Sequence, residues 1–319
     1  MNPSSSTPDL SESPVLALEN NIVWQFENLS EFGAKQLKLQ VAGGIFSGEI
    51  ALDLSATSPT GPSVTAREGG IPEMHIKVSH LELLWAFIYG WMVVYEEGVQ
   101  KPQLRPDVVM SEETSQLLSR AHELLEWAGS LRLGYTPYPA GLPSPKFYAT
   151  SQEQEYGLKA NLVFQKAVAF VLSHERAHAQ LGHLTIGERP LTAQERLDME
   201  RDADMAAYDA LVSQGLDDNE KLPEAWAVVS VMLSTFYLYE DARNALRPGG
   251  HPAVHHRVAH IIERLAMREP HYDYYFKFLC RLVLQAVFPD VLAPERQFDD
   301  WEDALADAFD RLDGLAAAP

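Results

Sequence analysis

Two histidines and a glutamate near the middle of the chain have the types and spacing of a metal-dependent hydrolytic site. His174, Glu175 and His178 form the pattern H-E-x-x-H inside a segment with strongly helical character. Side chains four residues apart project from one face of a helix, so the two imidazoles can bind one metal ion, and this geometry suits zinc. Glu175 is turned away from the metal, which leaves its carboxylate to take a proton from the attacking water.

A third metal ligand is expected from the acidic segment that follows. Glu200 lies 22 residues beyond His178 on the next predicted helix, and two imidazoles plus one carboxylate leave zinc an open position for water. Asp204, one helical turn later, faces the same side and can fix the orientation of a ligand histidine. Asp202 competes for the ligand role but lies about 200° round the helix from Glu200. The alternative is an ordinary acidic helix face in an acidic chain.

A third segment contains a histidine at the start of a predicted helix. His251 precedes Pro252, a residue typical of the first helical turn, and we expect this histidine to point into the cleft and donate a hydrogen bond to the oxyanion. Arg257 can anchor it or the nearby carboxylates. A second metal site is a less favoured alternative here, although His256 and His260 also have the four-residue spacing.

The composition excludes several partners and compartments. A formal net charge of -20 disfavours nucleic acid and anionic membranes. One cysteine, Cys280, permits no intrachain disulfide, and Met1 to Leu16 contains no apolar stretch typical of a signal sequence. Apolar runs at Leu83 to Tyr95 and Ala225 to Tyr239 are shorter than the roughly 20 residues of a spanning helix, so we interpret them as buried helices. These features predict a cytoplasmic protein without a membrane partner.

The chain is predicted to be α+β and mainly helical, with a small antiparallel sheet preceding a helical half. Alternation at Leu37 to Val41 and at Ile50 to Leu54 indicates strands, and Ser55 to Pro72 is rich in loop residues. We expect residues 1–14 to be disordered, residues 15–150 to hold the sheet and two helices as a substrate-binding or regulatory region, and residues 151–319 to form the helical catalytic region. Helices are expected at 81–97, 111–129, 154–182, 192–213, 223–246, 252–267, 271–287 and 298–312.

Together the three segments resemble the gluzincin group of zinc peptidases, and in particular the HtpX and CaaX-prenyl-protease family. That family's pattern is H-E-x-x-H, then E-x-x-x-D, then H-P with an arginine six residues after that histidine, and all occur here in order within residues 154–267. His183 matches a frequent extra histidine of soluble relatives. The resemblance implies zinc on His174, His178 and Glu200, Glu175 as base, Asp204 as support, and His251 with Arg257 at the transition state.

Two further families are similar to parts of the chain. The tryptophan-rich helix around Trp85 and Trp91, and the chain length, resemble the Lit-type phage-exclusion peptidases, which cleave a host translation factor on infection. The ImmA/IrrE-type peptidases, which cut a repressor, carry a similar active-site helix, but the segment from His251 to Arg257 favours the first family over them.

The residues therefore predict a zincin-like metallopeptidase that holds one Zn²⁺ per chain and hydrolyses peptide bonds in a protein or peptide substrate. A regulated protease of the phage-exclusion or repressor-cleaving type is one form of this prediction. The alternative outside enzymology is a metal-stabilised interaction protein whose zinc is closed off by a fourth side chain.

Overall fold

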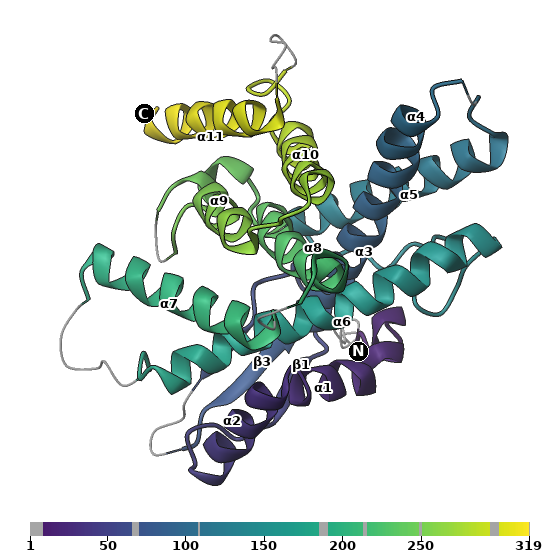
Figure 1. Cartoon of the computed structure of the whole chain (residues 1–319). Helices are drawn as coiled ribbons and strands as arrows, with labels where there is room; N and C mark the ends of the chain where they lie inside the picture. The colour runs from purple at the N-terminus through teal and green to yellow at the C-terminus, as the bar shows by residue number, and fades with distance from the viewer. Residues whose placement is uncertain are drawn as a thin grey trace, which may run out of the picture.

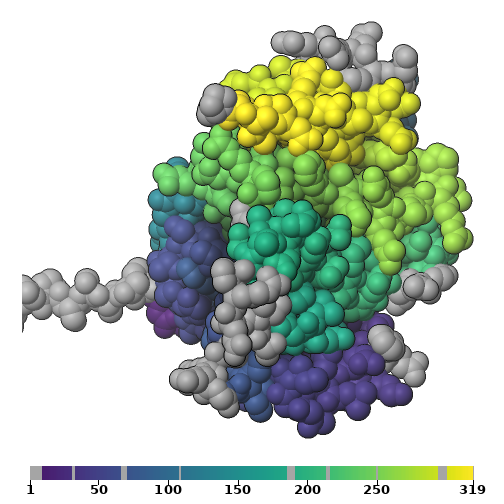
Figure 2. All heavy atoms as spheres, turned by 90° about the vertical axis from the view of Figure 1, so that its left-hand side faces the viewer, coloured from purple at the N-terminus to yellow at the C-terminus, as the bar shows by residue number. Residues whose placement is uncertain are grey.

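The computed structural model describes residues 9–65, 70–107, 109–184, 191–212, 216–248, 251–293 and 300–318. The protein is mainly helical with a small sheet, which confirms the predicted fold class. Figure 2 shows the C-terminal helix in yellow at one end of the molecule and the N-terminal helices in purple at the other. The helices are α1 (Glu19–Glu27), α2 (Glu31–Ala42), α3 (Val78–Tyr95), α4 (Lys101–Leu104), α5 (Glu112–Ser130), α6 (Ser151–Gln180), α7 (Ala193–Leu211), α8 (Asp218–Ser234), α9 (Val254–Leu265), α10 (Pro270–Val287) and α11 (Trp301–Ala317).

Helix α3 forms the centre of the core. Every one of its residues is buried, and it packs against α5, α6 and α8 (Figure 1). The stretch Val78–Leu104 is long and apolar enough to cross a membrane, but its most apolar window of 18 residues is buried inside the protein. The interpretation of Leu83 to Tyr95 as a buried helix is therefore confirmed.

The sheet has three short strands, β1 (Ile50–Asp53), β2 (Ser63–Thr65) and β3 (Glu73–Lys77), in the order β1-β3-β2. Strand β3 pairs parallel with β1 and antiparallel with β2, so the expected antiparallel sheet was wrong in part. The strand predicted at Ile50 to Leu54 is present as β1. Strand β2 lies inside the segment expected to be a loop, since three residues between proline-rich and glycine-rich stretches carry little alternation.

The strand predicted at Leu37 to Val41 was wrong, because these residues belong to helix α2. Ser30 caps that helix by accepting a hydrogen bond from the backbone N–H of Gly33. Leu37 and Gln40 are buried, three residues apart, whereas Leu39 and Val41 are exposed. The buried positions thus have the spacing of a helix, although apolar and polar residues alternate in the sequence as they do in a strand.

The helix expected at 223–246 is α8, which begins before that range, at Asp218, and ends inside it, at Ser234. Asp217 caps α8 in a reciprocal arrangement with Glu220. At the other end, the hydroxyls of Ser234 and Thr235 both donate to the carbonyl of Val231. Such side-chain bonds compete with the helical ladder, and the chain continues in two 3-10 turns, η4 (Thr235–Leu238) and η5 (Ala242–Leu246).

The segment before the first helix differs in part from the expected disordered lead-in. Residues 1–8 lie outside the described residues. Asp9 forms a bridge with Ser55, and Ser13 is buried and donates to Glu82 at 2.6 Å. Residues from Asp9 onward are therefore held against the core at the base of α3.

The close approach of α3 and α5 at Gly90 should make the stability of the protein sensitive to substitution of this glycine. A Cβ atom at Gly90 in α3 would lie far inside van der Waals contact with the Leu125 side chain of α5. Gly90→Ala should lower the free energy of unfolding by about 1–3 kcal/mol, despite the better helix propensity of alanine. Gly314→Ala in α11 is the control, because its Cβ meets nothing within 4 Å, and it should gain about 0.5–1 kcal/mol. Urea denaturation measures both, and a gain in the Gly90 variant would contradict the packing.

Candidate metal centre

Three metal-binding side chains meet where α6 packs against α7. His174 and His178 lie on successive turns near the end of α6, and Glu200 lies in the middle of α7. Thr192 caps α7 in a reciprocal arrangement with Glu195, which sets where the second helix begins. The long pairing of the two helices then brings Glu200 beside both histidines.

The spacing of the three donor groups fits a tetrahedral metal ion. The two Nε2 atoms of His174 and His178 are 3.1 Å apart, and they lie 3.4 and 3.5 Å from the Glu200 carboxylate oxygens. Tetrahedral zinc with bonds of about 2.0–2.1 Å requires donor separations of about 3.3–3.4 Å. Two imidazole nitrogens and a carboxylate are also a usual ligand set for this metal. The residues present therefore fit zinc.

Burial distinguishes Glu200 from Asp202, the two acidic residues that the sequence offered as the third metal ligand. Glu200 is buried and Asp202 is exposed, so the geometry brings Glu200 and not Asp202 to the histidines. Burial opposes ionisation of Glu200, but hydrogen bonds from His174 and His251 outweigh it and hold the pKa of this carboxyl well below its usual range. Glu200 is thus an anion at the pH of a cell.

A buried carboxylate supports the first histidine. Asp204 Oδ1 lies 2.9 Å from Nδ1 of His174, and the guanidinium of Arg257 on α9 donates to both Asp204 oxygens at 2.7 and 2.8 Å. Burial opposes the charge of Asp204, but Arg257 and His174 outweigh it and lower its pKa. The sequence predicted both Asp204 as support for a histidine and Arg257 as an anchor for a nearby carboxylate, and the structure brings them together.

His174 and His178 differ in the direction in which their pKa values are shifted. Burial disfavours charge at His174, but the Asp204 and Glu200 carboxylates outweigh it and raise the pKa of His174 to about 9. Burial and the neighbouring charge of His174 lower the pKa of His178 to about 4. A metal ion at the cluster would take the place of the proton on His174, because imidazole binds metals in its neutral form.

Glu175 lies apart from the three donors and beside the edge strand of the sheet. The backbone N–H of Val64 in β2 hydrogen-bonds its carboxylate, and burial raises the pKa of Glu175 to about 7. Its side chain lines a cleft of about 270 Å³ together with His174 and His251. This placement agrees with the expectation that Glu175 is turned away from the metal.

His251 and His183 complete the surroundings of the cluster. Nδ1 of His251 lies 2.7 Å from Glu200, and the side chain is 57% exposed at the mouth of the cleft. His183 lies just after α6, with its Nδ1 2.9 Å from Nδ1 of His178, as a supporting role requires. The oxyanion role expected of His251 stays a prediction.

Sequence reasoning missed one residue of the cleft. His80, in the first turn of α3, is buried, lines the cleft and has no hydrogen-bond partner for either ring nitrogen within the described residues. Burial lowers its pKa to about 4, so it is a neutral imidazole. It lies 94 positions before His174 with no motif around it, and only the packing of α3 against α6 brings it to the cleft.

The alternative of a second metal site was based on His256 and His260, but the structure brings a different set of residues together. His255 and His256, on α9, both contact the same Asp313 oxygen on α11 at 2.8 and 2.9 Å. His260 is absent from this group. The buried Nδ1 of His255 has no partner in the described chain, whereas a metal-binding histidine normally donates its second nitrogen to an acceptor. These contacts therefore join α9 to α11 as hydrogen bonds.

The buried ion pair between α7 and α9 should be far more important for stability than the exposed pair next to it. Asp204 and Arg257 have side chains only 6% and 14% exposed, whereas Asp209 and Arg264, on the same two helices, are about half exposed. Arg257→Met leaves a buried carboxylate uncompensated and should cost about 3–5 kcal/mol. Arg264→Met should cost about 0–1 kcal/mol. Urea denaturation in the presence of a chelator compares them without metal binding, and similar losses would contradict this view of the site.

The chain matches the family Peptidase U49 over residues 74–277, a range that includes the three candidate metal ligands, Glu175 and Arg257. It is 24% identical over 241 residues to the cell death peptidase of Escherichia coli (strain K12), covering 74% of this chain and 77% of that protein. No solved structure matches.

These findings support the Lit-type resemblance and not the HtpX and CaaX-prenyl-protease family. The three motifs of that family are short, whereas the match found here also includes β3, α3 and α5, which lie outside the motifs. This chain belongs to the Peptidase U49 family.

Proposed function

We propose that this protein is a zinc-dependent peptidase with His174, His178 and Glu200 as metal ligands and Glu175 as general base. The observation that carries the proposal is the cluster of three donors at tetrahedral spacing, one of which, His174, lines a cleft together with the separate carboxylate of Glu175. Membership of a peptidase family supports hydrolysis of a peptide bond in a protein substrate. When bound, zinc would supply Lewis acidity that polarises the substrate carbonyl and makes water more acidic.

The protein's own residues would hold the substrate and move the proton. Glu175 takes a proton from the attacking water and returns it to the leaving amine, so no covalent intermediate is needed. Its hydrogen bond from Val64 keeps the carboxylate at the wall of the cleft. Asp204 orients His174, and Arg257 balances the charge of Asp204.

A substrate strand would bind beside β2. This strand is at one edge of the sheet, and its Val64 N–H is directed toward Glu175 on α6. An extended peptide that pairs along this edge would pass the metal ligands, with main-chain hydrogen bonds providing affinity. Apolar side chains in the cleft, among them Phe170, Val171 and Leu238, favour an apolar substrate residue next to the cleaved bond. The ring of His80, which has no hydrogen-bond partner in the part of the chain that the structure describes, offers a further hydrogen bond to the bound peptide.

The cellular setting follows from a few features. The buried thiol of Cys280 and the strong negative charge fit a cytoplasmic protein that acts on proteins rather than nucleic acid. The similar protein of Escherichia coli is named a cell death peptidase. By analogy, this chain would cleave a specific protein under regulation, as phage-exclusion peptidases do.

Metal content and activity should separate the roles of the acidic residues. Glu175→Gln should keep about one zinc per chain and lose nearly all peptide hydrolysis, because it removes only the base. His178→Ala and Glu200→Ala should lose zinc as well, whereas Asp202→Ala, at an exposed carboxylate on the same helix, should keep it. Elemental analysis gives the metal content, and mass spectrometry of a digested peptide library gives activity. Retained hydrolysis in the glutamine variant would refute the role of Glu175.

One observation favours the alternative of an occluded, non-catalytic zinc site. Nδ1 of His251 lies 2.7 Å from Glu200, outside the group of three donors, and a shift of this exposed side chain would let it act as a fourth ligand. In a catalytic site, His251→Ala should keep zinc and reduce turnover, since the residue assists only the transition state. In an occluded site the same change should weaken zinc binding roughly 10-fold or more. Competition with a chromogenic chelator distinguishes these results.

A further inference from the structure

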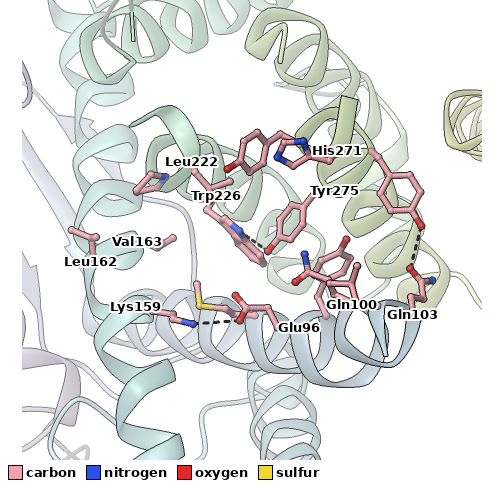
Figure 3. Close-up of a pocket in the computed structure, with 16 residues that line it drawn as sticks. Glu96, Gln100, Gln103, Lys159, Leu162, Val163, Leu222, Trp226, His271 and Tyr275 are labelled. Carbon is pink, nitrogen blue, oxygen red and sulfur yellow. Dashed lines mark hydrogen bonds and ion pairs between the residues drawn. The ribbon is translucent and has the colours of Figure 1, made fainter. Parts of the chain in front are cut away.

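A cavity larger than the cleft beside Glu175 lies away from the cluster of His174, His178 and Glu200. It has a volume of about 500 Å³, well within the range of small-molecule sites. It lies between the end of α3, the N-terminal half of α6, the start of α8 and the start of α10 (Figure 3). Val163, its nearest lining residue on α6, precedes His174 by 11 positions, or roughly 16 Å along the helix axis. The cavity is therefore a separate site.

Aromatic rings in fixed positions form much of the cavity wall. Trp226 Nε1 donates to the hydroxyl of Tyr275 at 2.8 Å, and the rings of Tyr95 and Tyr275 pack edge to face with centroids 4.4 Å apart. At the other side, the hydroxyl of Tyr274 donates to Gln103 at 3.3 Å (Figure 3). Because these contacts hold the rings before any ligand arrives, little ordering is needed on binding.

The helix geometry is unusual at this cavity. Helix α3 continues into a single π-helical turn, η2 (Glu96–Gln100), and both ends of that turn line the cavity. Such turns disturb the regular ladder of hydrogen bonds and occur often at functional sites. Here the turn presents the Glu96 carboxylate and the Gln100 amide toward the aromatic wall (Figure 3).

Among the described residues, one carboxylate and one ammonium line the cavity. Glu96 is the carboxylate, and its charge acts on the hydroxyls of Tyr95 and Tyr275. Lys159, the ammonium, lies 3.4 Å from Glu96 and equally far from Glu155, an exposed residue outside the cavity, and it lies over the Tyr156 ring. Because Lys159 is shared between two carboxylates, it balances the charge of Glu96 only in part. The remaining negative charge adds to the electron-rich faces of the aromatic rings.

We propose that this aromatic cavity binds an organic cation, an alkylammonium or guanidinium group carried on an apolar body. Tryptophan and tyrosine faces attract such cations, and the attraction strengthens where water is excluded. Glu96 supplies the countercharge, and the amide oxygens of Gln100 and Gln103 can accept hydrogen bonds from the cation. A chain with a net charge of -20 also draws cations toward its surface. The site requires neither the metal nor peptidase activity.

The direct test compares two probes of the same shape that differ in charge. Benzyltrimethylammonium carries the cation, and neopentylbenzene has carbon in place of the nitrogen. Ligand-observed NMR with Glu175→Gln protein gives both affinities, and the cation should bind roughly tenfold more tightly. Equal affinity for the two probes, or no binding of the cation at millimolar concentration, would overturn the proposal.

Variants locate the binding and provide a matched control. Glu96→Gln should weaken binding of the cation about tenfold and leave the neutral probe unchanged. Glu155→Gln removes the other carboxylate that contacts Lys159, outside the cavity, so it should weaken the cation much less than Glu96→Gln and leave the neutral probe unchanged. Tyr274→Leu, at a half-buried ring, should weaken the cation more than the neutral probe. Equal effects of the two glutamate variants would reject Glu96 as the countercharge and with it the site.

A competition experiment distinguishes a basic side chain of a protein partner from a free organic cation as the ligand. The N-acetyl N-methylamides of arginine and lysine mimic basic side chains on a protein, whereas benzyltrimethylammonium mimics a free small molecule. Displacement of the small cation by either amino-acid derivative at similar concentrations supports a basic side chain of a protein partner. Failure of both derivatives, with the small cation still bound, supports a free organic cation as the ligand.

Discussion

The buried carboxylate of Asp204 holds three helices together, and the arrangement of the metal-binding cluster depends on it. It contacts His174 of α6 and both donor groups of Arg257 of α9 from its own position on α7. A carboxylate in this environment is stable only while both partners stay in place, since an unpaired buried charge costs several kcal/mol. The orientation of His174 and the side-chain link between α7 and α9 are therefore set by the same group. Glu200 lies one turn before it and is brought to the histidines by the packing of α6 against α7.

Helix α3 is the other element on which the site depends, although none of its residues is a proposed metal ligand. Its burial over the whole length gives α6 and α8 a rigid surface to pack against. The close approach of α5 at Gly90 tightens that core on the other side. Through its first turn α3 also brings His80 to the cleft, and through its last turn it leads to the aromatic cavity. A helix that looks like a membrane span in the sequence is thus the scaffold for both sites.

The cluster of candidate metal ligands could be predicted from the sequence because the spacing within each helix is local, whereas metal binding itself stays a prediction. His174, Glu175 and His178 fall within one and a half helical turns, and Glu200 with Asp204 fall within the next helix. Helix periodicity alone determines which of these side chains share a face. Helix α3 and the helices from α5 onward were also located, since most have a long amphipathic pattern or a capping residue. Their bounds differ most at α8, which begins and ends earlier than expected, and at α11, which continues to Ala317.

The remaining features depend on contacts between distant segments, which periodicity does not encode. Leu37 to Val41 alternates as a strand does, yet the cap at Ser30 and the burial of Leu37 and Gln40 produce a helix. Strand β2 is only three residues long, and it exists because β3 provides partners for it. His80 reaches the cleft only through the packing of α3 against α6. The aromatic cavity likewise combines residues of four helices whose sequences are typical of ordinary core helices. Its fixed rings and the partly balanced charge of Glu96 become visible only once the chain is folded.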